Sequence, residues 1–131
     1  MAASESYPEG LLYNAEHDWA RIEGGEAVLG ITWYAADSLG DLVHYEPPAA
    51  GASVEKGRSY GEVESVKAVS DLIAPLSGEV LEVNTKVVDE PETVNADPYG
   101  EGWLVRIRLS DPAEADTLLE VDAYKQVVAE S

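Results

Sequence analysis

The segment at residues 103–109, WLVRIRL, constrains the fold more than any other part of the chain. Val105, Ile107 and Leu109 alternate with two arginines, which is the pattern of a strand with one buried face and one solvent face. Similar short apolar runs recur along the chain, and turn-forming Gly and Pro residues separate them. Further strands are predicted at residues 17–22, 26–31, 42–45 and 79–84. The sequence therefore favours a mainly β or α+β domain with many short strands.

Turn and capping residues indicate how these strands are joined. An acidic residue and two glycines at 23–25 form a turn signal, so the first two strands are expected to pair as a hairpin. Thr32 can cap a short helix that Gly40 would end in the left-handed conformation. Residues 88–102 are rich in Pro, Asp, Asn and Gly, which predicts a loop around one helical turn.

A length of 131 residues suits one domain with its own hydrophobic core, so residues 1–131 are expected to form a single domain. The last part of this domain is expected to be helical. Ser110 is a capping residue and Pro112 follows in the first turn. Apolar residues from Leu118 to Val128 then fit one or two helices.

The charge and the cysteine count exclude several functions. Twenty-six Asp and Glu against eight Lys and Arg give a formal net charge of -18, which would repel nucleic acid and an anionic membrane surface. No Cys is present, so the chain has no disulfide, no thiolate nucleophile and no Cys-based metal site. Sulfur redox chemistry would need a group that the chain does not supply.

The N-terminal residues MAASESYPEGLLYN contain neither a basic region nor the Arg-rich character of a transit peptide. No stretch approaches the length of apolar residues that spans a membrane. A cytoplasmic location is expected, or the mitochondrial matrix if a transit peptide has been removed.

Residues 62–71, EVESVKAVSD, contain a single lysine, Lys67, among valines and carboxylates. The valines recur at helical spacing, but they are β-branched and the segment is bounded by Gly61 and Pro75, as a hairpin would be. The pattern leaves helix and hairpin equally open, and a hairpin would place Val66 and Lys67 at its tip. A lysine acts as a nucleophile only when its charge is suppressed, whereas neighbouring carboxylates favour the charged form. A reactive amine is therefore disfavoured.

Several phrases of the sequence resemble the glycine cleavage system H proteins. They are ESVKA at 64–68 followed by SD and by APLSGEV at 74–80, EHDW at 16–19, GIT at 30–32, LGD at 39–41, VN at 94–95 and DPYGEGWL at 97–104. The resemblance covers residues 13–128. It implies a lipoyl-type fold, a barrel-sandwich hybrid of two small antiparallel sheets over about 13–109, with short helices and a C-terminal helical segment over 110–129.

In this family the resemblance implies that Lys67 lies at a hairpin tip and carries lipoate in amide linkage, as N6-lipoyl-lysine. The chain would be a carrier and not an enzyme. It would shuttle the aminomethyl group of glycine from the pyridoxal-phosphate glycine decarboxylase (P protein) to the folate-dependent aminomethyltransferase (T protein). Dihydrolipoyl dehydrogenase (L protein) would then reoxidise it. A lipoate ligase or octanoyltransferase would attach the cofactor, and the carrier would be a monomer.

The family also holds its loaded arm in a surface cleft. The resemblance assigns Asp18 to this cleft, where Glu is the commoner residue, together with Ser38, where some members have His, and Asp71. The alternative for Asp18 is an ordinary solvated carboxylate at a strand end. His17 and His44 are expected to have structural or surface roles and not to bind metal. The three tryptophans are expected to be core or half-buried, although an exposed Trp33 could mark a partner contact.

Two other functions remain open from the sequence. One is a related protein of the same fold that relays lipoyl groups to another pathway. The other is an interaction module whose Lys67 is never modified. Biotin carriage is disfavoured because biotin carriers flank their lysine with Met, whereas this chain has Val66 and Ala68.

Overall fold

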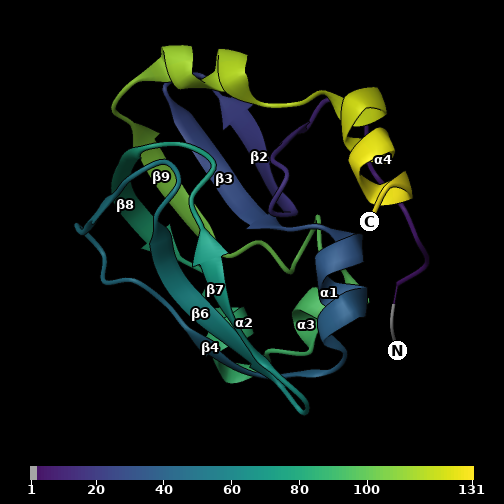
Figure 1. The fold of residues 1–131 in the computed structure, drawn as a ribbon. Helices are drawn as coiled ribbons and strands as arrows, with labels where there is room; N and C mark the ends of the chain where they lie inside the picture. The colour runs from purple at the N-terminus through teal and green to yellow at the C-terminus, as the bar shows by residue number, and fades with distance from the viewer. Residues whose placement is uncertain (1–2) are drawn as a thin grey trace.

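The computed structural model describes residues 3–131, and its larger sheet has six antiparallel strands (Figure 1). In spatial order these are β1 (Leu12–Tyr13), β2 (Asp18–Glu23), β3 (Glu26–Ile31), β9 (Val105–Leu109), β8 (Gly78–Val83) and β5 (Ser53–Val54). The predicted hairpin is present, because β2 pairs with β3 from Asp18 opposite Ile31 to Glu23 opposite Glu26. The predicted strand at 103–109 is also confirmed, although pairing begins only at Val105.

The smaller sheet has three antiparallel strands in the order β4 (Leu42–Glu46), β6 (Ser59–Ser65) and β7 (Val69–Ile73). The segment whose structure the sequence left open is thus a hairpin, with β6 and β7 paired and Val66 to Ala68 at its tip. This hairpin points to the end of the molecule opposite the turn that follows β9 (Figure 1). The expected fold of two small antiparallel sheets is confirmed.

Two hydrophobic clusters hold the sheets and the C-terminal segment in place. The main cluster lies between the sheets, where Leu29 and Ile107 of the large sheet and Val63 and Leu72 of the small sheet are buried. The second lies on the other face of β1–β3. Its buried members are Leu11, Tyr13, Trp19, Val28 and Tyr124. Tyr13 and Tyr124 stack with ring centroids 4.6 Å apart, so the C-terminal helix covers this face.

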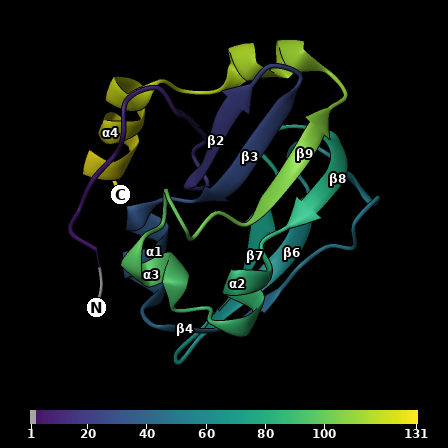
Figure 2. The same cartoon turned by 180° about the vertical axis from the view of Figure 1, so that it is seen from behind.

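Five short helical segments complete the fold: α1 (Trp33–Leu39), α2 (Thr85–Asp89), α3 (Thr93–Ala96), the 3-10 segment η1 (Pro112–Thr117) and α4 (Val121–Ala129), of which α2 and α3 are best seen in Figure 2. Thr32 caps α1 as predicted, because its side chain accepts a hydrogen bond from the Ala35 N–H. No helix of residues 3–131 has the length and apolarity needed to cross a lipid bilayer.

Three details of the helix prediction are wrong. Asp111, not Ser110, caps the segment after β9, because its carboxylate accepts a hydrogen bond from the Ala113 N–H. Gly40 has a positive φ of 82°, but its ψ of -161° lies outside the left-handed helical region. The segment predicted as a loop around one turn contains the end of α2 as well as α3. Asn84 explains this additional helix, since its side chain accepts a hydrogen bond from the Lys86 N–H and so begins α2.

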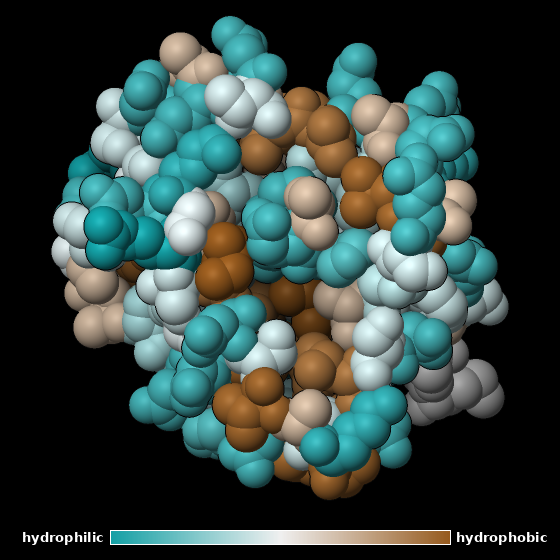
Figure 3. Space-filling model, in the orientation of Figure 1, coloured by the Kyte–Doolittle hydropathy of each residue, from teal (hydrophilic) through white to brown (hydrophobic). Residues whose placement is uncertain are grey.

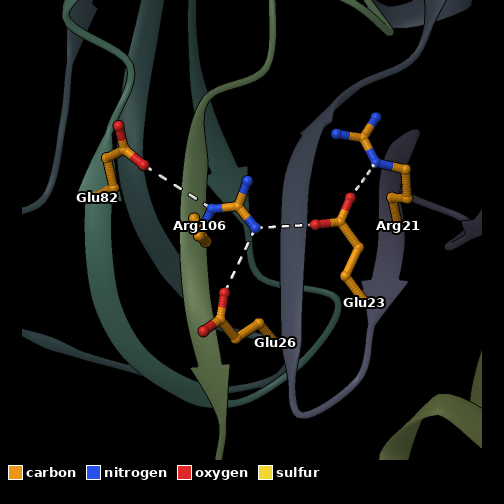
Figure 4. Close-up of polar contacts among 5 residues, drawn as sticks. All are labelled: Arg21, Glu23, Glu26, Glu82 and Arg106. Carbon is orange, nitrogen blue, oxygen red and sulfur yellow. Dashed lines mark hydrogen bonds and ion pairs between the residues drawn. The ribbon is translucent and has the colours of Figure 1, made fainter.

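The solvent face of the large sheet carries an arginine surrounded by glutamates. Arg106 of β9 contacts Glu23 Oε1 at 2.9 Å, Glu26 Oε1 at 3.4 Å and Glu82 Oε1 at 3.8 Å, and Glu23 also pairs with Arg21 (Figure 4). The hydrogen bond from Arg21 and then that from Arg106 lower the pKa of the Glu23 carboxyl. The arginines that alternate along β9 thus neutralise part of an acidic face.

Candidate functional site

Ser65 fixes the backbone of the hairpin tip. Its side-chain oxygen accepts hydrogen bonds from the N–H groups of Lys67 at 3.2 Å and Ala68 at 3.1 Å. The Ser65 N–H donates to the Ala68 carbonyl at 2.7 Å, and the Val66 N–H donates to the Asp41 carbonyl at 3.2 Å. Within residues 3–131, His17 is the one non-glycine residue with positive φ, so the tip needs no glycine. This is a local side-chain-to-backbone turn, which Ser is well suited to form.

The Ser65 contacts lead to a prediction about the tip. Ser65→Ala removes the acceptor of two backbone N–H groups, so we expect a loss of about 1 kcal/mol of stability and faster hydrogen exchange at Lys67 and Ala68. Amide exchange measured by NMR checks this expectation. Ser70→Ala is the matched control, because the Ser70 hydroxyl makes only a long 3.4 Å contact with the Asp71 carbonyl. Equal exchange rates at the tip in both variants would contradict the prediction.

Lys67 is exposed and lies on a hydrogen-bonded turn. Among the described residues its amine forms no ion pair, whereas all of the arginines pair with carboxylates. Its Cε lies only 3.7 Å from the position of a Cβ built on Gly40, so the side chain passes beside the end of α1. Val43, Val66 and Val69 nearby are 51%, 73% and 60% exposed. The tip is therefore an accessible lysine within an apolar surface.

Carboxylates lie in a row on the solvent face of the small sheet. In the strand register Glu46 of β4 is opposite Glu62 of β6, which is opposite Asp71 of β7. All three are exposed, and like charges directly opposite one another destabilise a sheet. This row of carboxylates therefore lowers the stability of the small sheet.

The structure separates the residues that the resemblance assigned to a cleft. Asp18 is 2% exposed, so a solvated strand-end carboxylate, the alternative considered for it, is wrong. Strand alternation puts its side chain on the same face as Ala20, which belongs to the core between the sheets. Asp71 is on the outer face of β7. Ser38 is exposed on α1, two residues before Gly40.

A compact turn buries the Asp18 carboxyl. Asn14 Oδ1 accepts from the Asp18 N–H at 2.8 Å, and Asn14 Nδ2 donates to Asp18 Oδ2 at 3.2 Å. Burial raises the pKa of the Asp18 carboxyl well above its usual value, the hydrogen bond from Asn14 opposes this shift, and the charge of Glu16 adds to it. A cationic group brought next to Asp18 would stabilise its charged form.

The two histidines have the expected structural and surface roles. His17 Nδ1 lies 2.8 Å from the Tyr124 hydroxyl, and Thr32 Oγ1 also lies 2.8 Å from that hydroxyl. This contact joins the turn before Asp18 to α4, and burial lowers the pKa of His17. His44 is exposed beside Glu46. In the described part of the chain, no three His, Asp or Glu side chains are grouped as metal ligands.

The tryptophans are buried or half-buried, as predicted. Trp19 is 0% exposed, and Trp33 and Trp103 are half-buried. The indole N–H of Trp33 donates to the Ala3 carbonyl at 2.8 Å, so this side chain contacts the N-terminal segment of its own chain. Trp33 is therefore not the exposed residue that would have marked a partner contact.

A hollow opens between the lysine hairpin and α1. Figure 3, in the orientation of Figure 1, shows hydrophobic residues at the floor of this hollow, beside β7 and α1. At the end of α1, Gly40 lies beside the Lys67 side chain of the hairpin tip. Two facing antiparallel sheets with an exposed lysine at a hairpin tip are the features of the lipoyl-type fold class.

Comparison with known proteins identifies the family. Residues 11–131 match the family model described as glycine cleavage H-protein. The chain is 52% identical over 117 residues to the glycine cleavage system H protein of Symbiobacterium thermophilum, covering 89% of this chain and 91% of that protein. It is also 52% identical over 123 residues to that of Anaeromyxobacter sp. strain K, covering 94% and 96%.

A solved structure agrees with these matches. The crystal structure of a glycine cleavage system H protein from Mycobacterium marinum superposes with a TM-score of 0.87 at 43% identity, covering 94% of this chain and 99% of that chain. The chain belongs to the glycine cleavage H-protein family, whose members are lipoate-bearing carrier proteins.

Proposed function

We propose that this chain carries lipoate on Lys67 and serves glycine cleavage as the carrier of the aminomethyl group. The observation that carries the proposal is the exposed Lys67 at a hairpin tip held rigid by Ser65. An amide bond at its amine would remove one positive charge from a surface where that amine has no ion pair among the described residues. The side chain therefore loses no charge partner on modification.

When bound, lipoate would supply reversible disulfide–dithiol chemistry for carrying the aminomethyl group. The chain itself would position the lipoyl arm and shield the group that it carries. Gly40 would let the lysine stem pass close to α1, and the apolar hollow would accept the aliphatic part of the arm. Asp18 would bind the cargo amine, while Ser38 and Asp71, both exposed, would contact the arm at the surface. No residue of the chain is assigned a catalytic role.

The partners would be the P, T and L proteins of the glycine cleavage system and the lipoate ligase or octanoyltransferase that attaches the cofactor. Neither nucleic acid nor membrane is a partner in this proposal. A monomeric carrier and a cytoplasmic location stay predictions from the sequence.

Two measurements test this function. The intact mass of the chain, purified from cells with active lipoylation, should exceed the sequence mass by one lipoyl group. The modified chain, mixed with its own decarboxylase, should support exchange of the glycine carboxyl carbon with labelled bicarbonate. An unmodified chain would favour an interaction module, whereas a modified chain without exchange would favour a lipoyl relay.

The acidic row near Lys67 gives a further prediction about docking. We expect transfer between partners to slow roughly tenfold when ionic strength rises from about 0.05 M to about 0.5 M, since salt screens steering toward basic surfaces. The melting temperature checks that the carrier stays folded. Glu62→Gln should reduce the rate at low salt and weaken its salt dependence, whereas exposed Glu130→Gln, at the C-terminal end, should not. Salt-insensitive turnover limited by docking would contradict this expectation.

A further inference from the structure

The hydroxyl of Tyr60 is buried without a hydrogen-bond partner. Tyr60 is 6% exposed, and its oxygen has neither donor nor acceptor among the described residues. Native proteins pair almost all of their buried polar groups, so an unpaired hydroxyl requires an explanation. Tyr45 provides a direct comparison, because its hydroxyl, also buried, donates to the Leu104 carbonyl at 3.2 Å. The fold therefore leaves one internal phenol free to bind something else.

A bulge in β6 directs Tyr60 into the space between the sheets. The strand register places Ser59 opposite Ile73 and Gly61 opposite Leu72, so two steps along β6 match one step along β7. A Cβ on Gly61 would lie 2.6 Å from the Glu46 carbonyl oxygen, so glycine is required at this close approach. Without the bulge, strand alternation from buried Val63 would point Tyr60 to solvent.

Asp18 approaches the same space from the opposite sheet. Its strand partner Ile31 belongs to the core cluster that also contains Tyr60. Burial and then the negative charge of Asp18 raise the pKa of the Tyr60 phenol, in agreement with this placement. Of the described residues, only Asn14 donates a side-chain hydrogen bond to the Asp18 carboxyl, and only to Oδ2. The second oxygen, Oδ1, has capacity for a further donor.

We propose that the Tyr60 hydroxyl and the Asp18 carboxyl, from facing sheets, together bind the primary amine of the aminomethyl cargo. This inference rests on the proposed function and adds Tyr60 as a second residue that binds the cargo. An amine offers several N–H donors, which suit a carboxylate on one side and a phenol oxygen on the other. In the unloaded protein the Tyr60 hydroxyl has no partner and so lowers the stability of the fold. In the loaded protein the same hydroxyl would bind the cargo amine.

The test compares Tyr60→Phe with the matched control Tyr45→Phe. In the unmodified protein, Tyr60→Phe should raise the melting temperature because it removes an unpaired hydroxyl, whereas Tyr45→Phe should lower it because it breaks the bond to Leu104. The lipoylated proteins are then loaded by the decarboxylase and separated from it. The half-life of the aminomethyl mass increment should fall about fivefold to tenfold in Tyr60→Phe, the loss expected for one hydrogen bond, and stay unchanged in Tyr45→Phe.

Each outcome decides between the alternatives. A lower or unchanged melting temperature for Tyr60→Phe means that a buried water already pairs the hydroxyl, and it overturns the inference. Equal half-lives in Tyr60→Phe and the parent protein also overturn it. If the parent protein is never loaded by the decarboxylase, the proposed function itself fails and the inference fails with it.

Discussion

Lys67→Arg should abolish lipoylation and glycine cleavage completely while leaving the melting temperature unchanged. A guanidinium cannot form the amide that a lysine amine forms, but it keeps the positive charge at the exposed tip. Because Lys67 makes no ion pair among the described residues, the fold should lose nothing. Intact mass, glycine–bicarbonate exchange and thermal melting measure the three parts of this expectation.

Lys56→Arg and Lys125→Arg are the controls for this variant. Both lysines are exposed and neither forms an ion pair within residues 3–131. They therefore match Lys67 in exposure and charge pairing, but neither lies at the tip of the β6–β7 hairpin. Both controls should keep the full lipoyl mass. A lipoyl increment that survives in Lys67→Arg and disappears in a control would move the attachment point and overturn the proposal.

Asp18→Asn should stabilise the protein by an amount that grows with pH. Burial raises the pKa of the Asp18 carboxyl above its ordinary value of 3.8, so the folded chain holds this proton at pH values where the unfolded chain has released it. Stability therefore falls as pH rises above about 3.8, and the fall ends once the folded pKa is passed. Each unit of pKa difference contributes about 1.4 kcal/mol. Asn does not titrate and can still accept the hydrogen bond from Asn14.

Urea unfolding of both proteins at a series of pH values measures this difference. At a pH below 3.8 both states hold the Asp18 proton, so the two proteins should have similar stability. A stability difference that shrinks as pH rises would contradict the prediction. If Asp18 binds the cargo amine, Asp18→Asn should also shorten the life of the loaded form.

The lysine hairpin shows why the sequence pattern alone could not distinguish a helix from a hairpin in this segment. Val63, Val66, Val69 and Ile73 have helical spacing, but only Val63 is part of the buried core, and Val66 and Val69 are exposed at the tip. Periodicity assumes that apolar residues are buried, and exposed valines around the proposed attachment site violate that assumption. The local pattern could not distinguish helix from hairpin here, and the resemblance to the H-protein family favoured the hairpin.

Two residues of the proposed site owe their placement to long-range packing, which local sequence patterns do not show. Alternation within β6 predicts an outward Tyr60, and only the bulge opposite β7 turns it inward. Glycine at position 61 was the available signal, since a lone glycine in a strand often marks a bulge. The burial of Asp18 depends on the turn made by Asn14, which no spacing rule identifies. By contrast, the alternating strand β9 and the Thr32 cap depend on local sequence and were predictable.

The position of β7 at one edge of the small sheet affects how copies of the chain meet. Within residues 3–131, no strand pairs with the outer edge of β7, and Val69 of this strand is exposed. This edge could therefore pair with the same edge of another molecule. Glu62 and Asp71 oppose such pairing by charge repulsion. Amide formation at Lys67 would change the net charge from -18 to -19, the loss of one positive charge. The modified carrier would therefore resist edge-to-edge aggregation more strongly than the unmodified chain.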